Sequence, residues 1–234
     1  PRFKPPFPAS FGLYGKPTTI NNTETFAAAP WVIRMGGAAY LACGKPNNGG
    51  TKIYSIQGDV ERPGNYEIPM GTPFATLLEL AGGVKGGKPL KAVIPGGSSS
   101  PVLPADIMMQ CTMDYDSIAK AGSMLDSGAV MVMDDSRDMV ETLQRLSYFY
   151  MHESCGQCTP CREGTGWLWR MVHRIQHGEG RPEDLDKLDN VAENIMGRTI
   201  CALGDAAAMP VRAMIKHFRH EFAAKIDAAQ KQSA

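Results

Sequence analysis

Four cysteines have the types and the spacing that could bind an inorganic cofactor. Three of them form a CxxCxxC run within ESCGQCTPCREG, and the fourth lies well downstream in RTICALGD. The compact run lets three thiolates face one iron-sulfur cube, and a distant fourth thiolate can bind the remaining iron. The sequence therefore predicts one [4Fe-4S] cluster with the ligands Cys155, Cys158, Cys161 and Cys201.

Two other chemistries suit a cysteine-rich motif. Structural zinc sites usually pair two cysteines with two ligands from a second short motif, whereas this first motif already holds three. His152, just upstream, could supply an imidazole ligand. A disulfide would leave an awkward third thiol, and nothing marks the chain as secreted. Zinc binding and a structural or redox thiol cluster stay open, while the spacing favours iron and sulfide.

Residues close to the cysteines could adjust such a cluster. Gly156 and Gly164 would let the backbone approach the cluster, so that N–H groups could donate to its sulfides. Arg162 and Arg198 would offset its negative charge and raise its potential. An equally good interpretation is that both arginines are solvated surface residues.

The cysteines must be positioned by helices. After Asp138, apolar residues recur every three or four positions in four segments, which predicts four amphipathic helices around 139–150, 167–175, 185–195 and 211–222. Short connections favour an up-down-up-down bundle. The cysteine run lies in the first connection and Cys201 in the third, and in such a bundle these two connections lie at the same end. The four thiols are therefore expected to converge.

The residues before Asp138 predict a different architecture. Between about 18 and 43, small and apolar residues interrupted by Pro30 and two glycines predict one or two packed helices. Between about 51 and 135, KIYSIQGDV, NYEIPMG, KAVIPGG, PVLP and GAVMVMDD predict short strands. FATLLELAGGV predicts a helix that ends at its glycines. Strands, one helix and more strands indicate a small α+β module.

Composition limits the classes of partner. Of 234 residues, 43% are hydrophobic, and Lys plus Arg balance Asp plus Glu at 24 each, so no overall field favours nucleic acid or an anionic membrane surface. No apolar run approaches the length of a spanning helix and no signal peptide is present, so we expect an intracellular protein without direct membrane insertion. The chain starts at Pro1 in a loop-like stretch, and we expect it to be the downstream part of something longer.

The other cysteines and the helical histidines are not expected to bind a cofactor or to take part in catalysis. Cys43 and Cys111 stand alone and should be packed thiols. The helical histidines lack metal spacing to the cysteines, so solvated or capping roles are expected for His173, His177, His217 and His220. The chain contains no GxGxxG and no GxxxxGK[ST], and IPGGSSSPV is expected to be a turn between strands. No catalytic set of side chains is legible, so no catalytic residue is assigned.

Three stretches together resemble one family. ESCGQCTPCREG with TICALGDAAAMPV resembles the cluster-binding region of the NADH-binding flavoprotein subunit (51 kDa type) of respiratory complex I, NADH:quinone oxidoreductase. IQGDVERPGNYEIPMGTPFATLLELAGGV resembles its soluble-ligand-binding β-grasp module, and GKPTTINNTETFAAAPW the final part of its flavin domain. The resemblance implies three parts: a remnant of the FMN/NADH-binding α/β domain (1–48), the β-grasp module (49–136) and a four-helix [4Fe-4S]-binding domain (137–234).

The resemblance also implies functional residues and a reaction. The cysteines named above match the cluster ligands, and Asn21, Asn22 and Thr25 match the segment that touches FMN. Without the family, that Asn-Asn-Thr run is better interpreted as a helix cap. The implied reaction is hydride transfer from NADH to FMN, followed by single-electron transfer through this cluster towards quinone. Since the cofactor-phosphate and NADH segments precede this region in the family, the chain alone is expected to be inactive and to bind neither NADH nor FMN usefully.

The implied partners are the other peripheral-arm subunits of complex I, including a thioredoxin-like [2Fe-2S] subunit. The implied location is the cytoplasmic face of a bacterial inner membrane, reached through the complex. Two alternatives are kept open. The chain could be the diaphorase subunit of an NAD-linked hydrogenase or formate dehydrogenase, or, in another functional class, a zinc-stabilised docking module.

Overall fold

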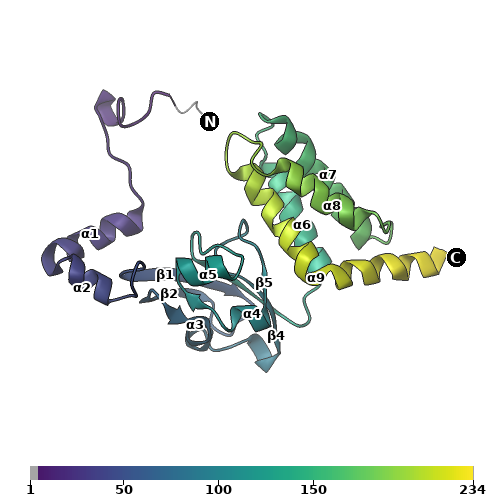
Figure 1. Cartoon of the computed structure of the whole chain (residues 1–234), viewed down its shortest axis with the longest axis horizontal. Coiled ribbons are helices and arrows are strands. Elements are labelled where there is room, and N and C mark those ends of the chain that lie inside the picture. The colour runs from purple at the N-terminus through teal and green to yellow at the C-terminus, as the bar shows by residue number, and fades with distance from the viewer. Residues whose placement is uncertain (1–4, 234) are drawn as a thin grey trace.

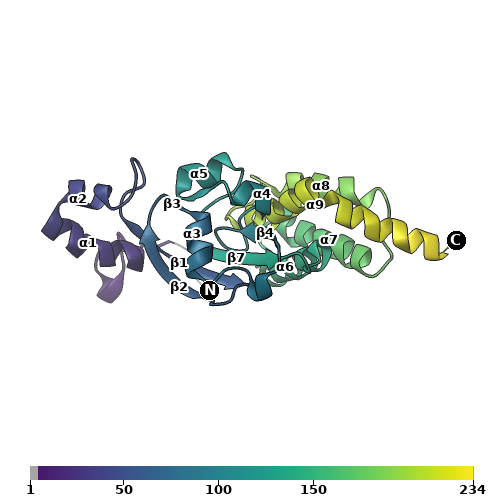
Figure 2. The same ribbon diagram turned by 90° about the horizontal axis from the view of Figure 1, so that it is seen from below.

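A computed structural model describes residues 5–233 of the chain and shows a mixed α+β protein of elongated shape. Within this range, a pair of helices lies at one end, a β-sheet in the middle and a group of longer helices at the other end (Figures 1 and 2). No helix in the described range is long and apolar enough to cross a membrane.

The N-terminal part contains the two helices that its sequence predicts. A short 3-10 turn (Leu13–Gly15) precedes α1 (Thr23–Met35) and α2 (Gly37–Ala42), which share an aromatic contact between Trp31 and Tyr40 with ring centroids 5.9 Å apart. None of the residues of α1 or α2, all of which the structure describes, is buried. The link to the sheet is polar, because the Glu24 carboxylate accepts the backbone N–H of Ile53 at 2.9 Å.

In the described range, the larger sheet has five strands: β1 (Thr51–Gly58), β2 (Gly64–Pro69), β4 (Leu90–Ile94), β5 (Leu103–Pro104) and β7 (Ala129–Asp134). Their order is β2-β1-β7-β4-β5, and only the β1–β7 pair among them is parallel. These strands and α3 (Phe74–Leu80), which ends just before Gly82 and Gly83, confirm the predicted elements. IPGGSSSPV connects β4 to the antiparallel β5, so the predicted turn is also confirmed.

Several short elements were not predicted. β3 (Thr72–Pro73) pairs with β6 (Thr112–Met113), and two short helices flank β6, namely α4 (Ala105–Met108) and α5 (Tyr115–Lys120). A 3-10 turn (Lys85–Gly87) follows α3. Strands of two residues, and helices of at most six, show too few repeats for a hydrophobic period to be recognised. For α5, Asp114 is a local sequence sign of a helix start, because its side chain caps the helix by accepting the N–H of Ser117 at 2.9 Å.

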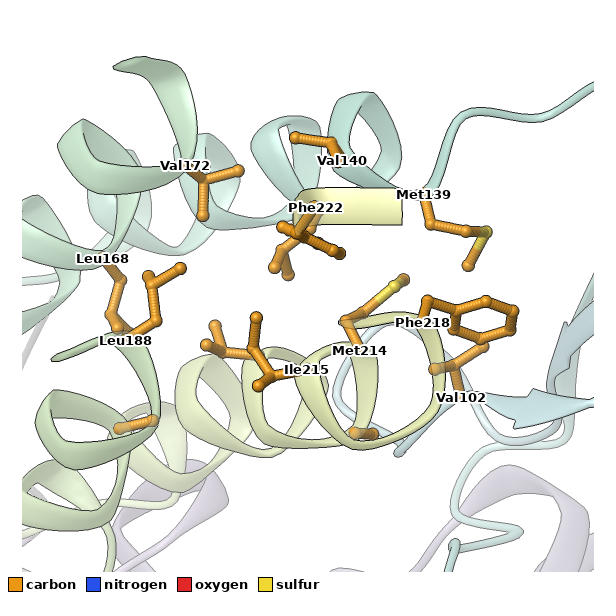
Figure 3. Packing of buried hydrophobic residues seen from close by; sticks show 14 of the residues in the cluster. Val102, Met139, Val140, Leu168, Val172, Leu188, Met214, Ile215, Phe218 and Phe222 are labelled. Carbon is orange, nitrogen blue, oxygen red and sulfur yellow. The ribbon is translucent and has the colours of Figure 1, made fainter. Parts of the chain in front are cut away.

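The C-terminal part consists of the predicted helices α6 (Met139–Glu153), α7 (Thr159–Gln176), α8 (Asp184–Ile195) and α9 (Leu203–Ser233). Each packs against the next, and α6 also packs against α9. The fourth helix is longer than its apolar stripe predicts and bends at Phe218, where φ is −123°. Figure 3 shows Val172, Phe222 and Ile215 among the side chains that fill the space between these helices.

Alternation along the central strands joins this helical core to the sheet. On β4, Ala92 and Ile94 pack with the helices, whereas Val93 between them packs on the opposite side. On β7, Met133 faces the helices and Val132 faces the second core, which also contains residues of α3 and α5. Successive side chains of a strand point to opposite faces. The long helices therefore pack on one face of the sheet at β4 and β7, and the short helices pack on the other face.

Candidate metal centre

Two loops bring the four predicted ligand cysteines to one end of the long helices. One loop joins α6 to α7 and carries Cys155 and Cys158, with Cys161 following in the first turn of α7, and the other joins α8 to α9 and carries Cys201. The loops touch, because the backbone N–H of Ile200 donates to Sγ of Cys158 at 3.3 Å. Figure 1 shows both loops at the end of the helices opposite the α7–α8 turn. The two connections thus lie at the same end, as the helix count predicts.

The cysteines sit at the beginnings of two helices. Cys158 is the N-cap residue of α7, and Cys161 follows in its first turn with 7% of its surface exposed. Cys155 and Cys201 are exposed, and Cys201 lies just before α9. The first N–H groups of a helix have no partner within the helix, and its dipole is positive at this end. Both helix ends therefore place positive partial charge beside these cysteines.

The loop between α6 and α7 is shaped by one glycine and one arginine. Gly156 has φ +76°, a backbone conformation that residues other than glycine rarely adopt. The Arg162 guanidinium donates to the carbonyl oxygen of Gly156 at 2.8 Å and also pairs with Glu163. Arg198 instead donates to the carbonyl oxygen of Asn194, at the end of α8. Arg162 therefore braces the cysteine loop, whereas Arg198 is bound to the preceding helix.

Gly164 lies at a close contact between two helices. It lies inside α7 and is buried, and a Cβ atom at this position would come within 2.7 Å of Cδ1 of Ile195. The expectation that its backbone approaches the cluster stays a prediction. The missing side chain lets α7 pack closely against α8, and that contact depends on tertiary packing that the sequence motif does not show.

Two other side chains near the loops have contacts that the cysteine motif alone does not predict. Oγ of Ser154 lies 3.2 Å from Sγ of Cys161. In the sequence, only the position of Ser154 next to Cys155 could have suggested this contact. His152 is exposed, pairs with Glu153 at 3.1 Å and stacks on Tyr148. Within residues 5–233, no group of three or more His, Cys, Asp or Glu side chains lies close enough to hold a single metal ion. An iron-sulfur cube places its ligands around a larger body, with one thiolate on each iron.

The end of α6 is fixed to the sheet beside the cysteine loop. The hydroxyls of Tyr150 and Ser98 are 2.8 Å apart, and Ser98 belongs to the turn between β4 and β5. Burial raises the pKa of the Tyr150 hydroxyl, so this side chain stays protonated and neutral at physiological pH. The position from which the α6–α7 loop departs is therefore held by a buried, uncharged contact.

The residues expected to contact FMN lie elsewhere. Asn22 caps α1, because its Oδ1 accepts the N–H of Glu24 at 2.8 Å. Asn22 and Thr25 line an open cavity of about 900 Å³ between the N-terminal helices and the sheet, whereas Asn21 is not among the residues that line it. Figure 2 shows α1 at the end of the molecule opposite the long helices. The structure does not bring these residues together with the cysteines.

Two family models match the chain. The NADH-ubiquinone oxidoreductase-F iron-sulfur binding region matches residues 141–225, a range that contains α7, α8 and all four predicted ligand cysteines. The SLBB domain matches residues 52–132, which include the strands of the larger sheet.

Relatives and solved structures agree with these matches. The F subunit of NADH-quinone oxidoreductase from Rickettsia bellii (strain OSU 85-389) is 54% identical over 97% of this chain and 55% of the relative. The same subunit from Rickettsia massiliae is 55% identical, over 97% of this chain and 54% of the relative. A crystal structure of an NAD+-reducing [NiFe]-hydrogenase in the H2-reduced state aligns with a TM-score of 0.84 and 33% identity, covering 97% of this chain and 38% of that chain. The chain spans about half the length of the curated relatives it matches.

Proposed function

This chain belongs to the family of NADH-quinone oxidoreductase F subunits, and we propose that it forms the electron-transfer part of such a protein, with Cys155, Cys158, Cys161 and Cys201 holding one [4Fe-4S] cluster. The observation that carries the proposal is the hydrogen bond from the Ile200 N–H to Sγ of Cys158, which joins the two cysteine loops. When bound, a cluster of this kind supplies single-electron transfer.

The residues around the thiols suit a negatively charged group. The N-terminal ends of α7 and α9 and the N–H of Ile200 offset negative charge, while the Arg162 guanidinium holds the loop in shape. Cys161 is buried and the other cysteines lie nearer the surface, so one side of the site excludes water and the other is open to an electron-transfer partner. Hydrogen bonds to sulfur, burial and nearby charge are the means by which a protein adjusts a cluster potential.

The finer architecture is also proposed. We assign α6–α9 to a four-helix bundle that carries the cluster, and the sheet with its short helices to a β-grasp module of the soluble-ligand-binding type. We propose the boundaries 1–48, 49–136 and 137–234 for the flavin-domain remnant, this module and the helical domain. The core that Met133 shares with the long helices indicates that the last two parts pack as one body.

For the whole protein we propose the reaction of its family: hydride transfer from NADH to FMN, then single electrons through the cluster towards quinone. Asn21, Asn22 and Thr25 are proposed FMN contacts, and the chain alone is expected to be inactive. A flavin held by α1 in its present position would lie far from the thiols (Figure 2). Direct electron transfer therefore requires α1 to pack differently in the full-length protein, which its absence of buried residues permits.

The proposed partners are peripheral-arm subunits of complex I, among them a thioredoxin-like [2Fe-2S] subunit, with the assembly on the cytoplasmic face of a bacterial inner membrane. The alignment with the NAD+-reducing [NiFe]-hydrogenase supports a second candidate, the diaphorase component of a soluble NAD-linked enzyme. Both candidates use the same cysteines, so the identity of the copurifying subunits distinguishes them.

Metal analysis of anaerobically purified protein tests the cluster. We expect about four irons and four acid-labile sulfides per chain, and the Cys201→Ala variant should lose most of both. Cys43→Ala is the matched control, since Cys43 is also exposed but lies outside both motifs. One zinc per chain without sulfide would instead support the docking-module alternative, and unchanged iron in Cys201→Ala would show that the fourth ligand is misassigned.

A further inference from the structure

Two histidines near the C-terminal end of α7 form a pair that the sequence does not single out. His173 and His177 are one helical turn apart, so their side chains share one face of the helix. Their ring centroids are 4.1 Å apart, with 37° between the ring planes. The sequence predicts separate solvated or capping roles for them, whereas the structure places the two imidazoles together.

Hydrogen bonds orient both rings through the same nitrogen. Nδ1 of His177 donates to the carbonyl oxygen of His173 at 2.8 Å, so the neutral ring keeps its lone pair on Nε2. Nε2 of the Gln144 side-chain amide, on α6, lies 2.8 Å from Nδ1 of His173, so that in this orientation the amide donates and Nδ1 accepts. The amide can present either its nitrogen or its oxygen. With the oxygen turned to the ring, Nδ1 of His173 donates and its Nε2 is also free to bind a metal.

We propose that Nε2 of His173 and Nε2 of His177 bind one divalent transition-metal ion of the Ni²⁺, Cu²⁺ and Zn²⁺ class, with water completing the coordination. Imidazole nitrogen suits these ions, whereas Mg²⁺ and Ca²⁺ prefer oxygen ligands. Metal-bound histidines usually donate their other ring N–H to a carbonyl or carboxylate. The His173 carbonyl takes that role for His177, and the Gln144 amide would take it for His173 once its oxygen faces the ring.

The site is separate from the cysteine centre. Cys158 caps the start of α7 and His177 caps its end, so the length of the helix, about 27 Å at about 1.5 Å per residue, lies between them. Among the described residues no third His, Cys, Asp or Glu joins the pair, so the site would be open to solvent. A bound ion would join successive turns and stabilise the last turn of α7. The inference does not depend on the proposed function of the cysteines.

Trp169 provides a reporter for this site, because its ring centroid is 5.0 Å from that of His173. We expect Ni²⁺, added to the anaerobically purified chain, to quench tryptophan fluorescence saturably and to raise the melting temperature. His173→Ala and His177→Ala should each raise the half-saturation concentration at least tenfold and remove the thermal shift. His220→Ala is the control, since His220 is exposed on α9 and its ring lies near Phe218 rather than near another histidine ring. An unchanged titration of His177→Ala, or an equal loss in His220→Ala, would overturn the proposal.

Variants of Gln144 test the positioning role. Gln144→Ala keeps both ligands but removes the group that orients His173, so Ni²⁺ should bind several-fold more weakly. Gln144→Glu restores an oxygen acceptor for Nδ1 and should return the affinity to that of the unaltered chain or better. If Gln144→Ala bound Ni²⁺ like the unaltered chain, the assigned orientation of His173 would be wrong.

Discussion

The two helical regions of this molecule are built from similar local signals but differ in what they pack against. In the N-terminal pair, no residue is buried and Ile33 is 83% exposed. In the C-terminal group, apolar side chains from α6, α7, α8 and α9 share one core, and Phe222 is fully buried. Most of the stability of a helix in a protein comes from packing an apolar face rather than from intrinsic propensity.

The difference shows that local sequence can determine where a helix forms without determining what the helix packs against. α1 begins where Asn22 caps it and ends before Gly36, so local sequence suffices to place it. Its apolar side chains nevertheless find no core here, and Phe26 and Met35 are exposed together with Ile33. A cluster of exposed apolar side chains marks a surface that another part of a protein covers. We therefore expect substitutions in the two regions to affect global stability very differently.

The largest contrast is expected from removing one apolar side chain in each region. Phe222→Ala leaves a cavity in the shared core and should lower the free energy of unfolding by about 3–5 kcal/mol. Ile33→Ala removes a side chain that contacts mainly solvent and should change it by less than about 0.5 kcal/mol. Urea unfolding followed by circular dichroism measures both. A loss of several kcal/mol in Ile33→Ala would show that α1 is packed in solution.

Elements with repeating patterns could be predicted from the sequence, and the rest could not for physical reasons. The strands β1, β2, β4 and β7 and the helices α6–α9 contain enough alternating or helical repeats to be recognised. The pairing of β3 with β6 involves two residues on each side and carries no pattern. The order of the strands also went unpredicted, because the parallel pairing of β1 with β7 joins segments that are distant in the sequence.

The candidate site shows the same division. The meeting of the two cysteine loops follows from counting helices, which needs only the apolar period. The close contact of Gly164 with Ile195 depends on how α7 packs on α8, and the stacked rings of His173 and His177 depend on side-chain rotamers. The position of α1 relative to the cysteines depends on contacts between distant segments. None of these three features can be predicted from a short stretch of sequence.

A smaller contrast is expected from adding one methyl group to a glycine in each region. Gly164→Ala places Cβ against the buried side chain of Ile195, and this overpacking should cost about 1–3 kcal/mol in unfolding free energy. In α2, no atom lies within 4 Å of a Cβ built on Gly37, so Gly37→Ala should change the free energy by less than about 0.5 kcal/mol. The midpoints of thermal unfolding compare the two. Equal losses would contradict the view that α6–α9 are closely packed whereas α1 and α2 are not.

The smallest and most discriminating contrast comes from the caps of one helix in each region. Asp138 accepts the N–H groups of Val140 and Glu141 at the start of α6 and pairs with Lys225 of α9, whereas Asn22 caps α1 through Glu24 alone. Removing an N-cap costs about 1 kcal/mol. In Asp138→Ala this cost should appear in global unfolding, because α6 unfolds together with the core.

Asn22→Ala should leave the global midpoint unchanged and speed amide hydrogen exchange in α1 alone, since a helix without buried contacts can open by itself. Asp138→Asn keeps a capping oxygen but loses the charge, so it separates the cap from the ion pair with Lys225. If Asn22→Ala lowered the global midpoint as much as Asp138→Ala, α1 would be coupled to the core, and the two regions would form one cooperative unit.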